Sequence, residues 1–129
     1  MSVPPAALSV RPLDLADLPG ALEIQAEAYP AFLREGEAAF ASRLRLPHSY
    51  CLAASRDGAL IAYLLAHGWP RQAPPPVGAV LTAAASEVLF IHDLAVSLVG
   101  RGSGIGRRLI EAVEGRPFER VLDQPAADP

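Results

Sequence analysis

Residues 88–113 read VLFIHDLAVSLVGRGSGIGRRLIEAV, and this stretch decides the fold. Its first nine residues are mostly apolar, which is typical of a buried strand. Its last nine residues place apolar side chains at helical spacing. Four alternating glycines at the junction permit a tight turn: Gly100, Gly102, Gly104 and Gly106. The sequence therefore predicts a strand, a glycine-rich turn and a helix in direct succession.

The glycine-rich turn has the chemistry of an anion-binding site. Backbone N–H groups in the first turn of a helix have no partner within the helix, and the helix dipole favours negative charge there. Arg101 and Arg107 flank the turn, and five of the eleven basic residues fall between residues 101 and 120. We expect the turn to hold a diphosphate group of a ligand.

Two common phosphate-binding motifs do not match this turn. A Walker loop needs a lysine, and every basic residue of this chain is an arginine. A dinucleotide fingerprint needs glycines spaced G-x-G-x-x-G, whereas the glycines here alternate. A plain tight turn and a generic nucleotide-binding turn stay open as alternatives.

The composition is that of one folded domain over residues 1–129. Hydrophobic residues make up 51% of the chain and charged residues 19%, which argues against disorder. The net charge of −3 gives no general attraction to nucleic acid, so we expect no nucleic-acid partner. Cys51 is the only cysteine, which excludes an intrachain disulfide, and we expect it to be a buried apolar residue. We expect no metal site.

The chain shows no pattern that directs it into or across a membrane. Its first residues lack the basic and apolar segments of a signal peptide. No apolar run approaches the ~18 residues that a membrane span requires. We therefore expect a cytoplasmic protein without a membrane partner.

Hydrophobic patterns and helix breakers predict the remaining elements. In chain order they are a strand over 7–12, a helix capped by Asp14 or Asp17 that ends before Pro30, a helix over 35–46, strands over 50–55 and 60–67, a loop over 69–86, a strand over 87–96 and a helix over 104–114. This order predicts an α+β fold with a mostly antiparallel sheet flanked by helices.

Several details of these elements are specific enough to test. Asp57-Gly58 predicts a type I′ hairpin turn. The strand over 87–96 is apolar on both faces, as a central strand is. Gly115 is the expected left-handed cap of the last helix. Residues 118–123 predict a short strand, and residues 124–129 predict a frayed end.

The turn also resembles a family signature. Residues Arg101-Gly102-Ser103-Gly104-Ile105-Gly106 resemble the Arg/Gln-x-x-Gly-x-Gly/Ala motif of the GNAT N-acetyltransferases. Leu94-Ala95-Val96 is similar to the end of their fourth strand, and the helix over 104–114 to their pyrophosphate-binding helix. The resemblance covers roughly residues 7–115, since the earlier order of strand, two helices and hairpin is also similar.

This resemblance implies an enzyme that moves an acetyl group from acetyl-CoA to an amine of a small molecule or a protein. It implies that the backbone of Leu94 and Val96 pairs with the pantetheine arm. It also implies which residues hold the coenzyme A pyrophosphate: Arg101, Gly102, Ser103, Gly104, Ile105, Gly106 and Arg107. In this family the amine attacks the thioester directly, and the enzyme supplies proximity, a proton acceptor and hydrogen bonds to the oxyanion.

His92 and Asp93 are the candidate proton acceptors, acting directly or through water. Neighbouring residues of a strand point to opposite faces, so we expect only one of the two to face the cleft. A structural polar group is the alternative for each. Tyr29 and Tyr50 are expected in the core or cleft wall.

The chain departs from the family pattern after its last helix. Members normally add a strand, a helix that often carries a thiolate-protonating tyrosine, and a final pair of strands. Only fourteen residues follow Gly115 here, and none is tyrosine, so we expect the C-terminal strands and helix to be largely missing. A non-catalytic acyl-CoA-binding or dimer-forming remnant is therefore the alternative function. A homodimer that covers the unfinished sheet edge is a further hypothesis.

Overall fold

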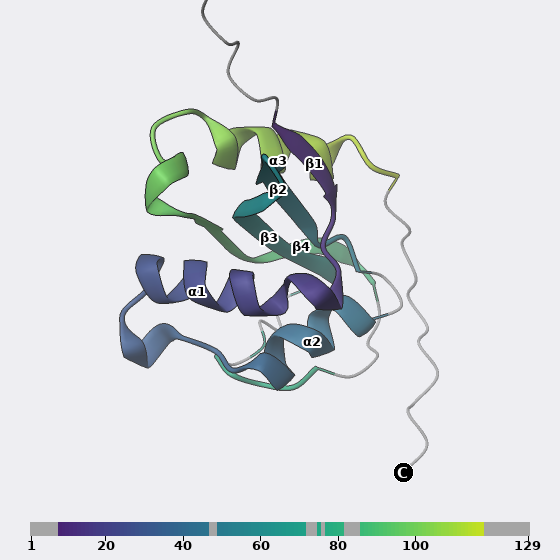
Figure 1. The fold of residues 1–129 in the computed structure, drawn as a ribbon. Helices are drawn as coiled ribbons and strands as arrows, with labels where there is room; N and C mark the ends of the chain where they lie inside the picture. The colour runs from purple at the N-terminus through teal and green to yellow at the C-terminus, as the bar shows by residue number, and fades with distance from the viewer. Residues whose placement is uncertain (1–7, 47–48, 72–74, 76, 82–85, 118–129) are drawn as a thin grey trace, which may run out of the picture.

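A computed structural model describes residues 8–46, 49–71, 75, 77–81 and 86–117. These residues form a four-stranded antiparallel sheet with helices on both faces, which confirms the α+β expectation (Figure 1). The strands lie side by side in chain order: β1 (Ser9–Pro12), β2 (Leu52–Arg56), β3 (Ala59–Trp69) and β4 (Val88–Val96).

Two helices cover one face of the sheet and one covers the other. Helices α1 (Leu18–Ala28) and α2 (Glu37–Arg45) lie on the same face, and α3 (Ile105–Glu114) lies on the opposite face (Figure 1). Helices α2 and α3 begin and end within two residues of the predicted bounds, and α1 begins directly after Asp17, one of its two expected caps. Short 3-10 turns precede or follow them: η1 (Leu15–Asp17), η2 (Ala31–Leu33) and η3 (Leu98–Gly100).

The sheet separates two hydrophobic cores, because side chains alternate along each strand. Tyr63 and Leu65 of β3 pack with α1 and α2, whereas Leu64 between them packs with α3. Helix α3 buries three side chains at helical spacing: Ile105, Leu109 and Val113. Burial of each stabilises the fold by about 1.5–3 kcal/mol, so the helix after the glycine turn is firmly fixed to the sheet.

The hairpin between β2 and β3 turns as predicted. Asp57 and Gly58 have φ values of 54° and 75°, and a type I′ turn requires positive φ at both positions. Cys51, just before β2, is buried as expected, and this burial raises the pKa of its thiol. A buried thiol with a raised pKa is a poor nucleophile.

The expected left-handed cap at Gly115 is wrong. Gly115 has a φ of −77°, in the right-handed region, and its amide donates to the carbonyl of Glu111. The amide of Arg116 then donates to the carbonyl of Val113. The helix therefore ends by tightening its last turn, which satisfies the terminal carbonyls without a left-handed residue.

The expectation of a central position for the strand over 87–96 is wrong for the sheet that the described residues form. There β4 is an edge strand, and most of its side chains are only partly buried. Its apolar run reflects helices on both faces of the sheet, a pattern that does not depend on a hydrogen-bonded neighbour at each edge. The strand and the frayed end predicted over 118–129 lie outside the described residues.

Candidate functional site

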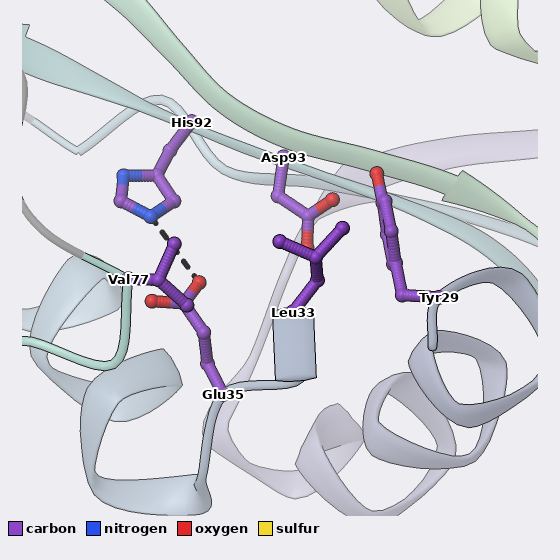
Figure 2. Close-up of a pocket in the computed structure, with 6 residues that line it drawn as sticks. All are labelled: Tyr29, Leu33, Glu35, Val77, His92 and Asp93. Atoms are coloured by element: carbon purple, nitrogen blue, oxygen red, sulfur yellow. Dashed lines mark hydrogen bonds and ion pairs between the residues drawn. The ribbon is translucent and has the colours of Figure 1, made fainter. Parts of the chain in front are cut away.

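A β-bulge in β4 places His92 and Asp93 on the same side of the sheet. Asp93 lies opposite Leu65 of β3 and Ile91 lies opposite Ala66, so His92 is the extra residue. An extra residue interrupts the alternation of faces along a strand. Both side chains line one cavity of about 160 Å³, and the expectation that only one of them faces the cleft is wrong (Figure 2).

The cavity lies between β4 and two connecting segments. One segment joins α1 to α2, and the other joins β3 to β4. The described residues that line the cavity come from all three parts: Tyr29, Leu33, Glu35, Val77, His92 and Asp93. Tyr29 is thus part of the cleft wall, as expected, whereas Tyr50 lies in the core on the α3 side.

Asp93 is held by hydroxyl groups. The Tyr63 hydroxyl donates to Oδ2 of Asp93 at 2.7 Å, and the nearby Tyr29 hydroxyl donates to the carbonyl of Leu94 at 3.1 Å. Burial and the Asp93 charge raise the pKa of Tyr29 to about 12 and also raise the pKa of Tyr63. Both phenols stay protonated donors at neutral pH. Within the described part of the chain, no cation forms an ion pair with Asp93.

Glu35, by contrast, already has a cationic partner. Its Oε2 accepts from Nη2 of Arg43 at 2.6 Å and from the amide of Gly78 at 2.6 Å. Its backbone exchanges two hydrogen bonds with the side-chain amide of Gln25, at 2.9 Å and 2.7 Å. Both side chains of the Glu35–Arg43 ion pair are buried. Together these contacts of Glu35 tie the two connecting segments to α1 and α2.

His92 is a neutral acceptor in this network. Nη2 of Arg43 is a donor only and lies 2.8 Å from Nε2 of His92, so we assign the Nε2 lone pair toward Arg43. Burial and the positive charge of Arg43 lower the pKa of His92, with Glu35 opposing them. Oε1 of Glu35 lies 3.2 Å from the same nitrogen, but with this assignment no hydrogen bond joins the two atoms. Of the two carboxylates among the described residues that line the cavity, Asp93 is consequently the one without a cationic partner.

The glycine turn forms an open cradle at the start of α3. Gly102 and Gly104 have φ values of +84° and +74°, in the left-handed region. A Cβ at either position meets no atom within 4 Å, so backbone conformation and not packing calls for glycine there. Among the described residues, the amides of Ile105, Gly106 and Arg107 have no acceptor. They are available to an anion.

Two side chains shape the edges of this cradle. The Ser103 hydroxyl donates to the carbonyl of Gly100 at 2.6 Å, which closes the turn. Nε of Arg101 donates to the carbonyl of Val96 at 3.2 Å. Arg101 and Arg107 are both exposed, so their charge is accessible to an anionic ligand.

The outer carbonyls of β4 connect the cavity with the cradle. The carbonyl of Leu94 accepts from Tyr29 beside Asp93, and the carbonyl of Val96 accepts from Arg101 beside the turn. Each carbonyl oxygen has two lone pairs. A ligand that donates a hydrogen bond to one of these carbonyls therefore shares it with the Tyr29 or Arg101 side chain, or displaces that side chain. The structure thus brings the predicted site residues into one path along β4.

Sequence reasoning missed Glu35, Arg43 and Tyr63. Their contacts with His92 and Asp93 join residues 30 to 57 positions apart, and no local motif reports such pairs. Arg43 carried one signal: it lies three residues after Phe40, on the buried side of α2. A cation on the apolar side of a helix indicates a buried counter-ion.

The model of the acetyltransferase (GNAT) family matches residues 18–125. The chain belongs to this family. The comparison with curated proteins found no significant match. Among the described residues, no helix is long and apolar enough to cross a membrane, and no group of His, Cys, Asp and Glu side chains could hold a metal ion.

Solved structures of this GNAT fold resemble the chain at low sequence identity. The ribosomal-protein-S18-alanine N-acetyltransferase of Escherichia coli superimposes with a TM-score of 0.60 at 20% identity, over 83% of this chain and 57% of that one. Arabidopsis thaliana Naa50 with a bisubstrate analogue of CoA gives 0.59 at 16% identity, over 83% and 62%. The aminoglycoside N-acetyltransferase AAC(6')-Iy with CoA gives 0.66 at 18% identity, over 88% and 71%.

The first two of these structures are longer than this GNAT chain, which spans less than two-thirds of their length. At these identities the likeness concerns the fold. The acceptors named for these proteins, a ribosomal protein and an aminoglycoside among them, differ in chemistry.

Proposed function

We propose that this GNAT protein is an N-acetyltransferase that moves the acetyl group of acetyl-CoA to the amine of a small molecule or a protein. One observation carries the proposal. A cavity that holds the Asp93 carboxylate is joined along β4 to an open cradle of backbone amides. An amine and an activated acyl donor are the ligands that suit these two ends.

The cradle fits the diphosphate of coenzyme A. The amides of residues 102–107 lie at the start of α3, where the helix dipole adds positive potential, and Arg101 and Arg107 add charge. The backbone of Leu94 and Val96 would run beside the pantetheine arm. Bound there, acetyl-CoA supplies a thioester carbonyl as the electrophile.

We assign proton transfer to Asp93. Its carboxylate attracts an ammonium group and accepts a proton, directly or through water, so that the neutral amine attacks the thioester carbonyl. The C–S bond then breaks, and coenzyme A leaves as a thiolate that takes up a proton from water. The Tyr63 hydroxyl fixes the carboxylate at 2.7 Å. We assign His92 a positioning role, because its Nε2 lone pair is directed at Arg43.

The test is acetylation of a panel of primary amines, followed by thiol release and by the mass of the acetylated product. Asp93→Asn keeps the shape of the side chain and removes its basicity, so kcat falls about 100-fold or more while acetyl-CoA affinity changes little. Glu87→Gln is the matched control, because this carboxylate precedes β4 and is not among the described residues that line the cavity. Full kcat in Asp93→Asn contradicts the assignment.

Calorimetry separates the alternatives. Coenzyme A binding without thiol release on any amine favours a non-catalytic acyl-CoA-binding remnant. Equal affinity for adenosine phosphates that lack pantetheine favours a generic nucleotide binder. Tighter binding of coenzyme A together with acetylation supports the enzyme.

The homodimer also stays a prediction. Leu98 and Val99 follow β4 directly and are exposed apolar side chains, which a second copy could cover. Light scattering at micromolar concentration measures the mass, and a monomeric value contradicts the dimer.

A further inference from the structure

We infer that the acceptor is a compact monoamine, with a single ammonium group attached to an apolar body. This inference rests on the proposed N-acetyltransferase function and narrows its substrate class. It follows from what each wall of the cavity can still offer a ligand.

Among the described residues that line the cavity, one carboxylate is available to a cation. Glu35 already accepts from Arg43 and from the amide of Gly78, so its charge is compensated. His92 is neutral and faces Arg43. Within the described part of the chain, Asp93 has the neutral hydroxyl groups of Tyr63 and Tyr29 beside it and forms no ion pair with a cation. One ammonium group can therefore be neutralised in this cavity.

Two apolar side chains stand among the described residues that line the rest of the cavity. They are Leu33 and Val77, and Figure 2 shows Leu33 in front of Asp93 and Val77 in front of Glu35, below His92. Leu33 is 41% exposed and Val77 is 58% exposed. A second ammonium group placed against these side chains loses water without gaining a partner, whereas an apolar substituent buries surface on both sides.

The size of the cavity points the same way. The cavity of about 160 Å³ is below the roughly 300 Å³ at which drug-sized ligand sites begin. This size favours a compact acceptor.

Two amines with the same carbon chain test the inference directly. Pentylamine carries one ammonium group, and cadaverine carries a second at its far end. We expect kcat/KM for pentylamine to exceed that for cadaverine by at least about tenfold, because the second charge meets an apolar wall. Equal or better use of cadaverine overturns the inference and leaves N-acetyltransferase activity standing.

A variant sharpens this comparison. Val77→Asp adds a carboxylate to the wall, so KM for cadaverine falls about tenfold. The ratio of kcat/KM for pentylamine to kcat/KM for cadaverine then becomes smaller, whereas KM for acetyl-CoA is unchanged. Val80→Asp is the matched control, because Val80 is 62% exposed but does not line the cavity. A Val77→Asp enzyme whose preference equals that of Val80→Asp contradicts the role of this wall.

A binding measurement makes the test independent of turnover. Methyl NMR of Leu33 and Val77 follows both amines in the presence of coenzyme A, and pentylamine should saturate at the lower concentration. Equal saturation, or none by either amine, overturns the inference. This binding preference without acetylation of any amine contradicts the proposed function alone.

Discussion

The glycine cradle and the acceptor cavity differ in how their residues are spread along the chain. The cradle uses consecutive residues, 101–107, within one strand–turn–helix unit. The cavity joins His92 with Arg43 across 49 positions and with Glu35 across 57. A site made of neighbours in the sequence can be recognised as a motif, whereas a site made by folding depends on buried interactions that no short motif contains.

The largest expected effect comes from removing the buried ion pair beside the cavity. Arg43→Leu leaves Glu35 as a buried charge without its counter-ion, so the free energy of unfolding falls by about 3–5 kcal/mol. Urea unfolding measures this loss. Arg45→Leu is the control, because Arg45 is exposed at the end of the same helix, and it changes stability by about 0.5 kcal/mol or less. Equal stability of the two variants contradicts a structural role for the ion pair.

The pH dependence of stability tests the packing beside the cavity. His67 is buried against the His92 ring, and burial lowers its pKa to about 4 from 6.5. Between these two pH values the unfolded chain binds a proton that the native chain excludes. The free energy of unfolding therefore decreases as the pH is lowered through this window. We expect a loss of about 2 kcal/mol between about pH 7 and about pH 5.

The control for this pH effect is His67→Asn, whose amide can still donate to the carbonyl of Gly68 but does not titrate. Most of the pH dependence should disappear in urea unfolding of this variant. The residual slope belongs to His92, whose pKa is also lowered. An unchanged slope in His67→Asn contradicts the assignment to His67.

A smaller effect is expected in the cradle. Gly104→Val puts a β-branched residue at a φ of +74° and fills space above the amides, so coenzyme A affinity falls by about tenfold or more. Arg101→Ala removes an exposed charge, and we expect about a fivefold loss. Calorimetry ranks the two variants.

Gly58→Val separates backbone strain from loss of the ligand. Gly58 has a φ of +75° and open space around its Cβ position, but it lies in the hairpin turn away from the cradle. This variant should lose stability as Gly104→Val does and keep coenzyme A affinity. Intact affinity in Gly104→Val would show that the cradle is not the binding site.

The sequence predicted the elements that local chemistry determines. The helices around the core, the Asp57-Gly58 turn and the strand–turn–helix unit follow from periodicity, breakers and glycine conformation. The prediction of a left-handed cap at Gly115 failed, because two backbone hydrogen bonds satisfy the terminal carbonyls of α3 without a left-handed residue. The prediction of a central position for β4 failed in the sheet of the described residues, because apolar faces do not report which strands are paired.

The cavity was predicted only in part. His92 and Asp93 were recognised, but their common orientation depends on a register shift against β3, which periodicity cannot show. The partners that decide their roles, Arg43 and Tyr63, lie on other elements. Long-range polar contacts are selected by the packed fold, so a single sequence indicates the reactive groups without their neighbours.

The most direct test follows the cradle amides while acetyl-CoA is added. Amide NMR signals of Ile105 and Gly106 should shift until the protein is saturated, and the melting temperature should rise as binding stabilises the native state. If saturating acetyl-CoA leaves both these amides and the melting temperature unchanged, the start of α3 does not hold the diphosphate and the proposed acetyl transfer is contradicted.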